Sequence, residues 1–201
     1  AIDLFAGLEP RRDLRAVVLS GSGSNFCAGA DLNWMSRMVS YTRDENVRDS
    51  SKLAKMYAVI NECPIPVVGR VQGAAIGGGV GLVAVCDMAI STRDAKFGLS
   101  EVKLGILPAV ISPYVISKIG VTHSRALFLT GERFDAERAL RIGLVHRLAD
   151  DLDVDPLAPR FQLLDGSSTE RVSRGQDDVA ALALERRGEL KEVQDGDVSN
   201  S

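Results

Sequence analysis

The chain has 201 residues, of which 45% are hydrophobic and 25% are charged, a composition typical of a globular protein with a substantial core. Its net charge of −3 is unevenly distributed, because residues 149–201 contain 13 acidic and 6 basic side chains and residues 1–148 contain 14 acidic and 18 basic ones. This mild basic excess suits a phosphorylated ligand, but it argues against a nucleic-acid-binding protein.

No apolar run reaches the ~20 residues of a membrane-spanning helix, and the N-terminus lacks the charged and then apolar pattern of a secretory signal. The three cysteines, Cys27, Cys63 and Cys86, lie in apolar surroundings. Their odd number favours buried, reduced thiols over a disulfide framework. We therefore expect a cytoplasmic protein with no membrane partner and no nucleic-acid partner.

The first elements are a helix and a strand. Residues 1–9 place apolar side chains at helical spacing, which predicts the end of an amphipathic helix. Residues 15–20 form a β-rich run that ends in glycines and serines, which predicts a buried strand and a loop. Small residues around Gly29 then indicate a loop whose main chain allows close approach by another group.

Thr42 and Glu45 have the spacing of a capping box, so a helix is expected to begin there. Its apolar periodicity continues to Cys63, after which prolines end it. Residues 67–71 predict a second buried strand, and residues 87–91 predict a third. Strands that alternate with helices through short connections are typical of parallel α/β units.

Residues 71–82 lie between these two strands and are rich in glycine. Glycine at this density suits a sharp turn where a ligand approaches the main chain. If a helix begins near Gly77, its first N–H groups lack intrahelical partners and form a cradle for an oxygen anion. A close helix-packing cluster without a ligand is the alternative, with about equal weight.

The last regular elements are helical. Ser112 and Pro113 predict a helix that ends at Gly120, Thr122 predicts a further helix to Thr130, and Asp135 predicts the start of another one. Beyond residue 150 the pattern weakens, although residues 179–184 favour a further helix. We expect a core formed by residues 1–148 and an acidic, partly helical appendage formed by residues 149–201.

Several glycine-rich and acidic motifs follow one another in a recognisable order. They are Phe26-Cys-Ala-Gly-Ala-Asp31, Gln72-Gly-Ala-Ala-Ile-Gly-Gly-Gly79, Cys86-Asp87, Phe97-Gly-Leu-Ser-Glu101, Gly105-Ile-Leu-Pro108, Leu129-Thr-Gly131 and residues 139–145. Together they resemble the enoyl-CoA hydratase/isomerase (crotonase) superfamily over residues 1–148. The resemblance implies an α/β superhelix of ββα repeats with a C-terminal helical appendage. It also implies assembly as a homotrimer or a dimer of trimers.

The resemblance implies an acyl-CoA substrate, so coenzyme A enters with the substrate and no separate cofactor is expected. Carried over by position, the backbone N–H groups of Ala30 and Gly78 form an oxyanion hole for the thioester carbonyl, and Glu101 is the catalytic acid/base. Glu101 is the only acid in a long apolar stretch, where burial would raise its pKa. The residues expected to line the substrate are Ala28, Asp31, Leu32, Trp34, Gly77, Gly81 and Pro108.

Some of these assignments have structural alternatives. A helix cap or an exposed position is the alternative for Glu101, local loop stabilisation for Asp31, and core packing for Trp34. His123 and His146 lack the spacing of metal ligands, so no metal is expected.

The chain departs from the two-glutamate hydratases at Gly81, where those enzymes have their second glutamate. Members with one glutamate include isomerases as well as hydratases. The chain looks most like bacterial methylglutaconyl-CoA hydratase-type members, which act on branched acyl-CoAs in leucine or isoprenoid breakdown. We therefore expect an enoyl-CoA hydratase of fatty acid metabolism or leucine degradation. The alternatives are an enoyl-CoA isomerase and a non-catalytic acyl-CoA-binding or scaffold protein.

The two ends of the chain also depart from the family. The chain begins after the family's first strand, and residues 151–201 do not clearly resemble its closing helices. An incomplete chain at either end is therefore an expectation.

Overall fold

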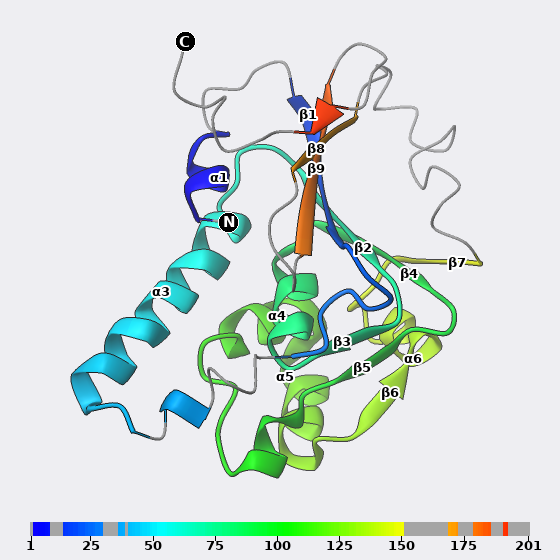
Figure 1. The fold of residues 1–201 in the computed structure, drawn as a ribbon. Helices are drawn as coiled ribbons and strands as arrows, with labels where there is room; N and C mark the ends of the chain where they lie inside the picture. The colour runs from blue at the N-terminus through cyan, green and yellow to red at the C-terminus, as the bar shows by residue number, and fades with distance from the viewer. Residues whose placement is uncertain are drawn as a thin grey trace.

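Two sheets form the framework of the protein in the computed structural model (Figure 1). The structure describes residues 2–8, 14–29, 36–38 and 40–150, together with the strands at 169–172, 179–185 and 191–192. The larger sheet has the strand order β10-β8-β9-β1-β2-β4-β7, and the smaller sheet has the order β3-β5-β6.

The middle of the larger sheet is parallel, as the sequence predicts. Its four strands in this region are β1 (Leu14–Gly21), β2 (Val67–Val71), β4 (Met88–Thr92) and β7 (Arg147–Ala149). Each is parallel to its neighbour, with Val17 opposite Val67 and Val68 opposite Met88. Most residues of β1 and β2 are buried, which explains their continuous rather than alternating apolar runs.

The smaller sheet consists of three-residue strands that the sequence analysis did not predict, because so short a run shows no period. They are β3 (Ala74–Ile76), β5 (Lys96–Gly98) and β6 (Arg133–Asp135). The pairs β2–β3 and β4–β5 each place their first strand in the larger sheet and their second in the smaller one. A helix follows each pair, so the chain has the ββα repeats that the resemblance implies.

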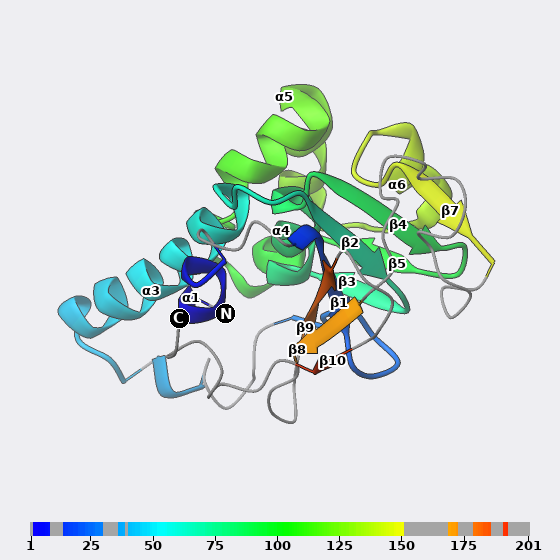
Figure 2. The same ribbon diagram turned by 90° about the horizontal axis from the view of Figure 1, so that it is seen from above.

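The helices cover these sheets and contact one another. They are α1 (Ile2–Ala6), α3 (Arg43–Asn61), α4 (Gly78–Val85), the 3₁₀ helix η1 (Ser100–Leu104), α5 (Ser112–Thr130) and α6 (Ala136–Arg141). The short α1 packs against the long α3 (Figure 2). The predicted capping box is confirmed at the start of α3, where Thr42 and Glu45 each accept a hydrogen bond from the other's backbone N–H.

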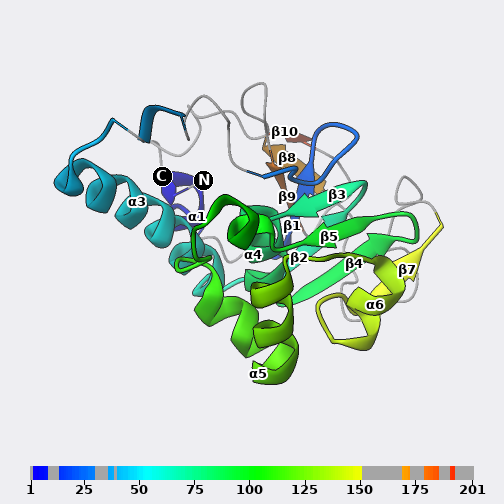
Figure 3. The ribbon, with the colours of Figure 1, turned by 90° about the horizontal axis from the view of Figure 1, so that it is seen from below.

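Helix α4 is the centre of the core. It lies between α3 and the strands (Figure 3) and also contacts α5. All its residues from Gly79 to Val85 are buried, as expected of a helix that is apolar all round. Tyr57 and Ile60 of α3 and Val115 of α5 belong to the same core cluster. The start of α4 is therefore held by packing on several sides.

Helices α5 and α6 follow the predicted order. The helical geometry is interrupted at Gly120, as predicted, with φ 76° and ψ 164°, and the second part of α5 then runs to Thr130, where the further helix was expected to end. Ile111 rather than Ser112 is the N-cap of α5. The helix predicted at Asp135 is confirmed as α6, and the Asp135 side chain accepts a hydrogen bond from the Arg138 backbone N–H at 2.8 Å.

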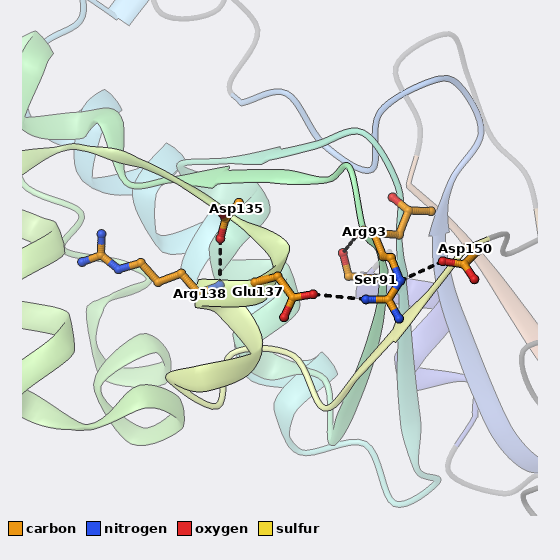
Figure 4. A network of polar contacts seen from close by, with 7 residues as sticks. Ser91, Arg93, Asp135, Glu137, Arg138 and Asp150 are labelled. Atoms are coloured by element: carbon orange, nitrogen blue, oxygen red, sulfur yellow. Dashed lines mark hydrogen bonds and ion pairs between the residues drawn. The ribbon is translucent and has the colours of Figure 1, made fainter.

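An exposed polar network connects α6 to the larger sheet (Figure 4). Arg93 follows β4 and donates to Asp150, beyond β7, at 2.7 Å and to Glu137 of α6 at 3.1 Å. Since these groups are exposed, each pair contributes at most about 1 kcal/mol to the stability of the fold.

The region beyond residue 149 differs from the prediction. The described residues there form β8 (Thr169–Val172), β9 (Val179–Glu185) and β10 (Lys191–Glu192). The helix predicted over residues 179–184 is therefore wrong. Short apolar runs are compatible with either structure, and here β9 pairs antiparallel with β1, whose backbone groups it satisfies. The division into a core and an appendage at residue 149 stays a prediction.

Candidate active site

The glycine-rich turn before α4 has the conformation that the sequence predicts for a close-approach site. Gly77 is the N-cap of α4, with φ 55° and ψ −116°, a conformation that side chains strongly disfavour. Its backbone N–H donates to the carbonyl of Gly98 in β5 at 2.8 Å. Its carbonyl accepts from the N–H groups of Val80 at 2.9 Å and Gly81 at 3.3 Å.

These bonds determine the direction of the Gly78 N–H. The structure has no cis peptide among the described residues, so the Gly78 N–H points opposite to the Gly77 carbonyl, away from the helix. Within the described part of the chain, no acceptor pairs with it. Gly78 is only partly buried, and the positive end of α4 lies here. The group therefore suits an incoming oxygen anion.

A second segment lies along the same turn. The N–H of Phe26 donates to the Gln72 carbonyl at 2.8 Å. The N–H of Cys27 donates to the Ala74 carbonyl of β3 at 2.9 Å, and the Cys27 carbonyl accepts from the Ile76 N–H at 2.9 Å. A Cβ built on Gly79 would lie 2.5 Å from the Cys27 carbonyl, so the chain after Cys27 leaves from beside the start of α4. The exposed Ala28 lies on this path.

Four predicted site residues follow Ala28 but lie outside the described residues. They are Ala30, Asp31, Leu32 and Trp34. Their roles, including that of the Ala30 N–H as the second oxyanion donor, stay predictions.

Glu101 lies at the start of η1, and its carboxylate lies over the glycine turn. A Cβ built on Gly77 would be 3.2 Å from the Oε1 atom of Glu101 and 3.9 Å from its Oε2 atom. Oε2 is buried and has no hydrogen-bond partner among the described residues. Burial raises the pKa of Glu101, although its own backbone N–H opposes the shift. A half-buried carboxylate with a raised pKa is suited to accept and return a proton.

The position of the missing second glutamate is filled. A Cβ built on Gly81 would lie 2.3 Å from Cγ2 of Ile111 and 3.0 Å from Cε1 of Tyr57. No side chain fits here without displacing these two residues. Gly81 therefore provides space for packing, and its contact with the substrate stays a prediction.

Sequence reasoning missed Tyr57, which it treated only as part of a helix face. The Tyr57 side chain is 2% exposed, and its hydroxyl donates to the Gly78 carbonyl at 2.9 Å. Burial raises the pKa of Tyr57, and the nearby Cys27 and Glu101 raise it further, so the phenol stays neutral. The helical periodicity indicated only that Tyr57 faces the core.

The remaining candidates lie apart from the turn or have structural roles. Pro108 is buried beyond η1, and its contact with a substrate stays a prediction. His146 exchanges backbone and side-chain bonds with Ala89, while His123 is exposed. The cysteines are free thiols, of which only Cys86 is fully buried.

Among the described residues, no group of His, Cys, Asp and Glu side chains is arranged to hold a metal ion. None of the helices in the same residues combines the length and apolarity needed to cross a membrane.

The ββα superhelix, with a carboxylate over the glycine turn that begins a buried helix, defines an α/β protein of the crotonase fold. The family model described as enoyl-CoA hydratase/isomerase matches residues 1–158, and the chain belongs to this family.

Named relatives agree with this assignment. A Thermus thermophilus protein assigned as an enoyl-CoA hydratase is 37% identical over 142 residues, which are 71% of this chain and 56% of the relative. The mitochondrial Delta(3,5)-Delta(2,4)-dienoyl-CoA isomerase of Mus musculus is 35% identical over 162 residues, covering 76% of this chain and 50% of the isomerase.

Solved structures show the same fold. The crystal structure of an enoyl-CoA hydratase from Shewanella pealeana is similar with a TM-score of 0.77 and 41% identity, over 83% of this chain and 63% of that one. The chain thus spans about half the length of the curated relatives that it matches.

Proposed function

We propose that the protein is an enoyl-CoA hydratase, which adds water across the C2–C3 double bond of a short or branched acyl-CoA. The observation that carries this proposal is the Glu101 carboxylate against Gly77, next to the unpaired N–H of Gly78. The relatives named as hydratases support the reaction class. Coenzyme A would enter as part of the substrate.

The proposed reaction begins with the thioester oxygen at the N–H groups of Gly78 and Ala30. The Glu101 carboxylate takes a proton from water while the water oxygen forms a bond to C3. The electron pair of the double bond moves onto the thioester oxygen, and the enolate forms there. Protonated Glu101 then returns its proton to C2, so that one water molecule is added. An oxyanion donor lowers such a barrier by about 3–4 kcal/mol.

The direct test is Glu101→Gln, which keeps the side-chain shape and removes the base. We expect hydration of linear and branched 2-enoyl-CoAs to slow by about 100- to 10,000-fold, the usual contribution of general acid–base catalysis. Loss of the enoyl absorbance and the mass of the product measure it. The exposed Glu62 offers a matched control, since Glu62→Gln should retain the parental rate. Parental hydration by Glu101→Gln would refute the proposal.

An enoyl-CoA isomerase is the second candidate, because the filled space at Gly81 removes the second carboxylate position. In this reaction Glu101 would move a proton between two carbons, as the mouse relative's name suggests for that protein. A 2-enoyl-CoA and a 3-enoyl-CoA, each in H₂¹⁸O, separate the two. Incorporation of ¹⁸O from the 2-enoyl substrate favours hydration, and conversion of the 3-enoyl substrate to its 2-enoyl isomer without ¹⁸O favours isomerisation. Tight binding without turnover would indicate the non-catalytic alternative.

We also propose a homotrimer or a dimer of trimers in the cytoplasm, and a branched acyl-CoA of leucine degradation as one candidate substrate. Leu107 is 82% exposed and Leu129 is 75% exposed, and large apolar side chains at a surface suit a subunit interface. Light scattering measures the assembly, and a panel of acyl-CoAs with mass detection identifies the substrate.

A further inference from the structure

The first turn of α4 needs contacts from outside the helix. Three glycines follow one another from Gly77 to Gly79, and no side chain caps the helix. Consecutive glycines have large conformational freedom. An oxyanion donor works only if it is held in place before the charge develops. The bonds of Gly77 direct the Gly78 N–H, and a further contact is needed to restrict Gly78 itself.

Backbone hydrogen bonds hold the peptide groups around Gly78. The Gly77 N–H is bonded to Gly98 at 2.8 Å, and the Gly77 carbonyl is bonded to Val80 at 2.9 Å. The next peptide group begins with the Gly78 carbonyl, which belongs to the first turn of α4 and accepts, in addition to the helix bonding, the Tyr57 hydroxyl at 2.9 Å. This side-chain bond connects α3 to the first residue of α4.

The hydroxyl also restricts Gly78 sterically. A Cβ built on Gly78 would lie 2.9 Å from the Tyr57 oxygen, so this oxygen lies against the Gly78 α-carbon. The ring itself is held by close packing against Gly81 and by Tyr114, whose ring centre is 6.1 Å away. The packed Tyr57 ring therefore holds its hydroxyl in one position.

We propose that Tyr57 is a positioning residue for the oxyanion donor: by holding the Gly78 carbonyl it restricts rotation about the Gly78 α-carbon and adds to the Gly77 bonds that direct the Gly78 N–H. Tyr57 does not touch the substrate in this role. It supplies, together with Ile111, the packing that replaces a second carboxylate at residue 81. The inference rests on the proposed function, since it assigns a partner to the proposed oxyanion hole.

Tyr57→Phe is the test, because it removes only the hydroxyl and keeps the ring. We expect kcat to fall about five- to tenfold, the effect of one lost hydrogen bond, with KM changed less than about twofold. Tyr114→Phe is the matched control, since it removes a hydroxyl from the neighbouring ring. It should keep the parental kcat. Equal losses in both variants would indicate general packing and would overturn the inference.

A spectroscopic readout separates positioning from stability. A 2-enoyl-CoA carrying ¹³C at the thioester carbonyl is bound to Glu101→Gln, in which it persists, and to Glu101→Gln with Tyr57→Phe. Infrared difference spectra then report the carbonyl stretch. We expect the Tyr57→Phe change to move this band toward its frequency in free solution. An unmoved band together with an unchanged kcat would overturn the role of Tyr57.

The same measurements distinguish failure of the proposed function from failure of the role of Tyr57. If the labelled thioester fails to bind, or if Glu101→Gln hydrates at the parental rate, then the proposed function fails and the inference fails with it. If it binds, and Glu101→Gln is inactive while Tyr57→Phe behaves as the parent in both measurements, then only the role of Tyr57 is wrong.

Discussion

The carboxylate of Glu101 lies so close to the α-carbon of Gly77 that an added Cβ would be 3.2 Å from its Oε1 atom. Gly77 is required here for two reasons, since its φ of 55° also disfavours a side chain. Glu101 faces this turn while its Oε2 atom has no hydrogen-bond partner among the described residues. A buried, unpaired carboxylate oxygen lowers stability and is therefore best explained by function.

The ionised Glu101 carboxylate should lower the stability of the folded protein at neutral pH. Burial raises the pKa of Glu101 in the folded state. The contribution of Glu101 to folding stability is therefore fully present below its unfolded-state pKa of about 4.3, and it is lost as the pH rises through the folded-state pKa. Glu101→Gln should then raise Tm at pH 7.5 by roughly 2–4 °C, and the difference should vanish near pH 4. Thermal melts across this range measure it. A lower Tm for Glu101→Gln at pH 7.5 would contradict the assignment.

Gly81→Ala should destabilise the protein by about 1–3 kcal/mol, because the new methyl group would overlap Ile111 and Tyr57. Ile111→Ala removes the closest atom, so the double variant should lose less than the sum of the two single losses. Urea unfolding measures the three values. Gly23 has open space around its Cβ position, and Gly23→Ala is the control, with an expected change within about 0.5 kcal/mol. Additive losses would contradict the packing account.

His146 should make the fold sensitive to acid. Its Nδ1 atom accepts the Ala89 N–H at 3.1 Å, and burial, followed by the charge of Lys118, lowers its pKa. A lowered pKa gives stability that is present above the unfolded value of about 6.5 and lost as the pH falls through the folded value. His146→Asn keeps a side-chain acceptor without titrating.

We therefore expect the unfolding free energy of His146→Asn to fall less than that of the parent between pH 7.5 and pH 5. Urea unfolding at several pH values measures it. His123→Asn, at an exposed histidine of α5, should keep the parental pH dependence. Parallel curves for His146→Asn and the parent would show that His146 does not cause the acid sensitivity.

Lys118 should stabilise the opposite end of α4. Its Nζ atom donates to the carbonyls of Cys86 at 2.6 Å and Asp87 at 3.1 Å, where the helix dipole is negative. Lys118→Met should cost about 1.5–3 kcal/mol, because it removes hydrogen bonds from a charged donor. Urea unfolding measures the loss, with Lys55→Met at an exposed position of α3 as the control. Equal stability of the two variants would show that these bonds contribute little.

Much of the architecture could be predicted from local patterns. The capping box of Thr42 predicted the start of α3, and the apolar runs predicted β1, β2 and β4, because these signals lie within a few consecutive residues. The three-residue strands β3, β5 and β6 have no such signal. Their existence depends on pairing between segments that are distant in the chain.

By itself, the sequence determined the glycine turn at Gly77 and Gly78 and identified Glu101 as the candidate acid/base, since residue type and motif order carry that information. Only the tertiary structure placed Glu101 over Gly77, showed that Tyr57 and Ile111 fill the space at Gly81, and made residues 179–185 a strand beside β1. The physical reason is the same in each case. Which groups share a small volume, and which backbone edge is open for pairing, depend on chain segments that no local pattern connects.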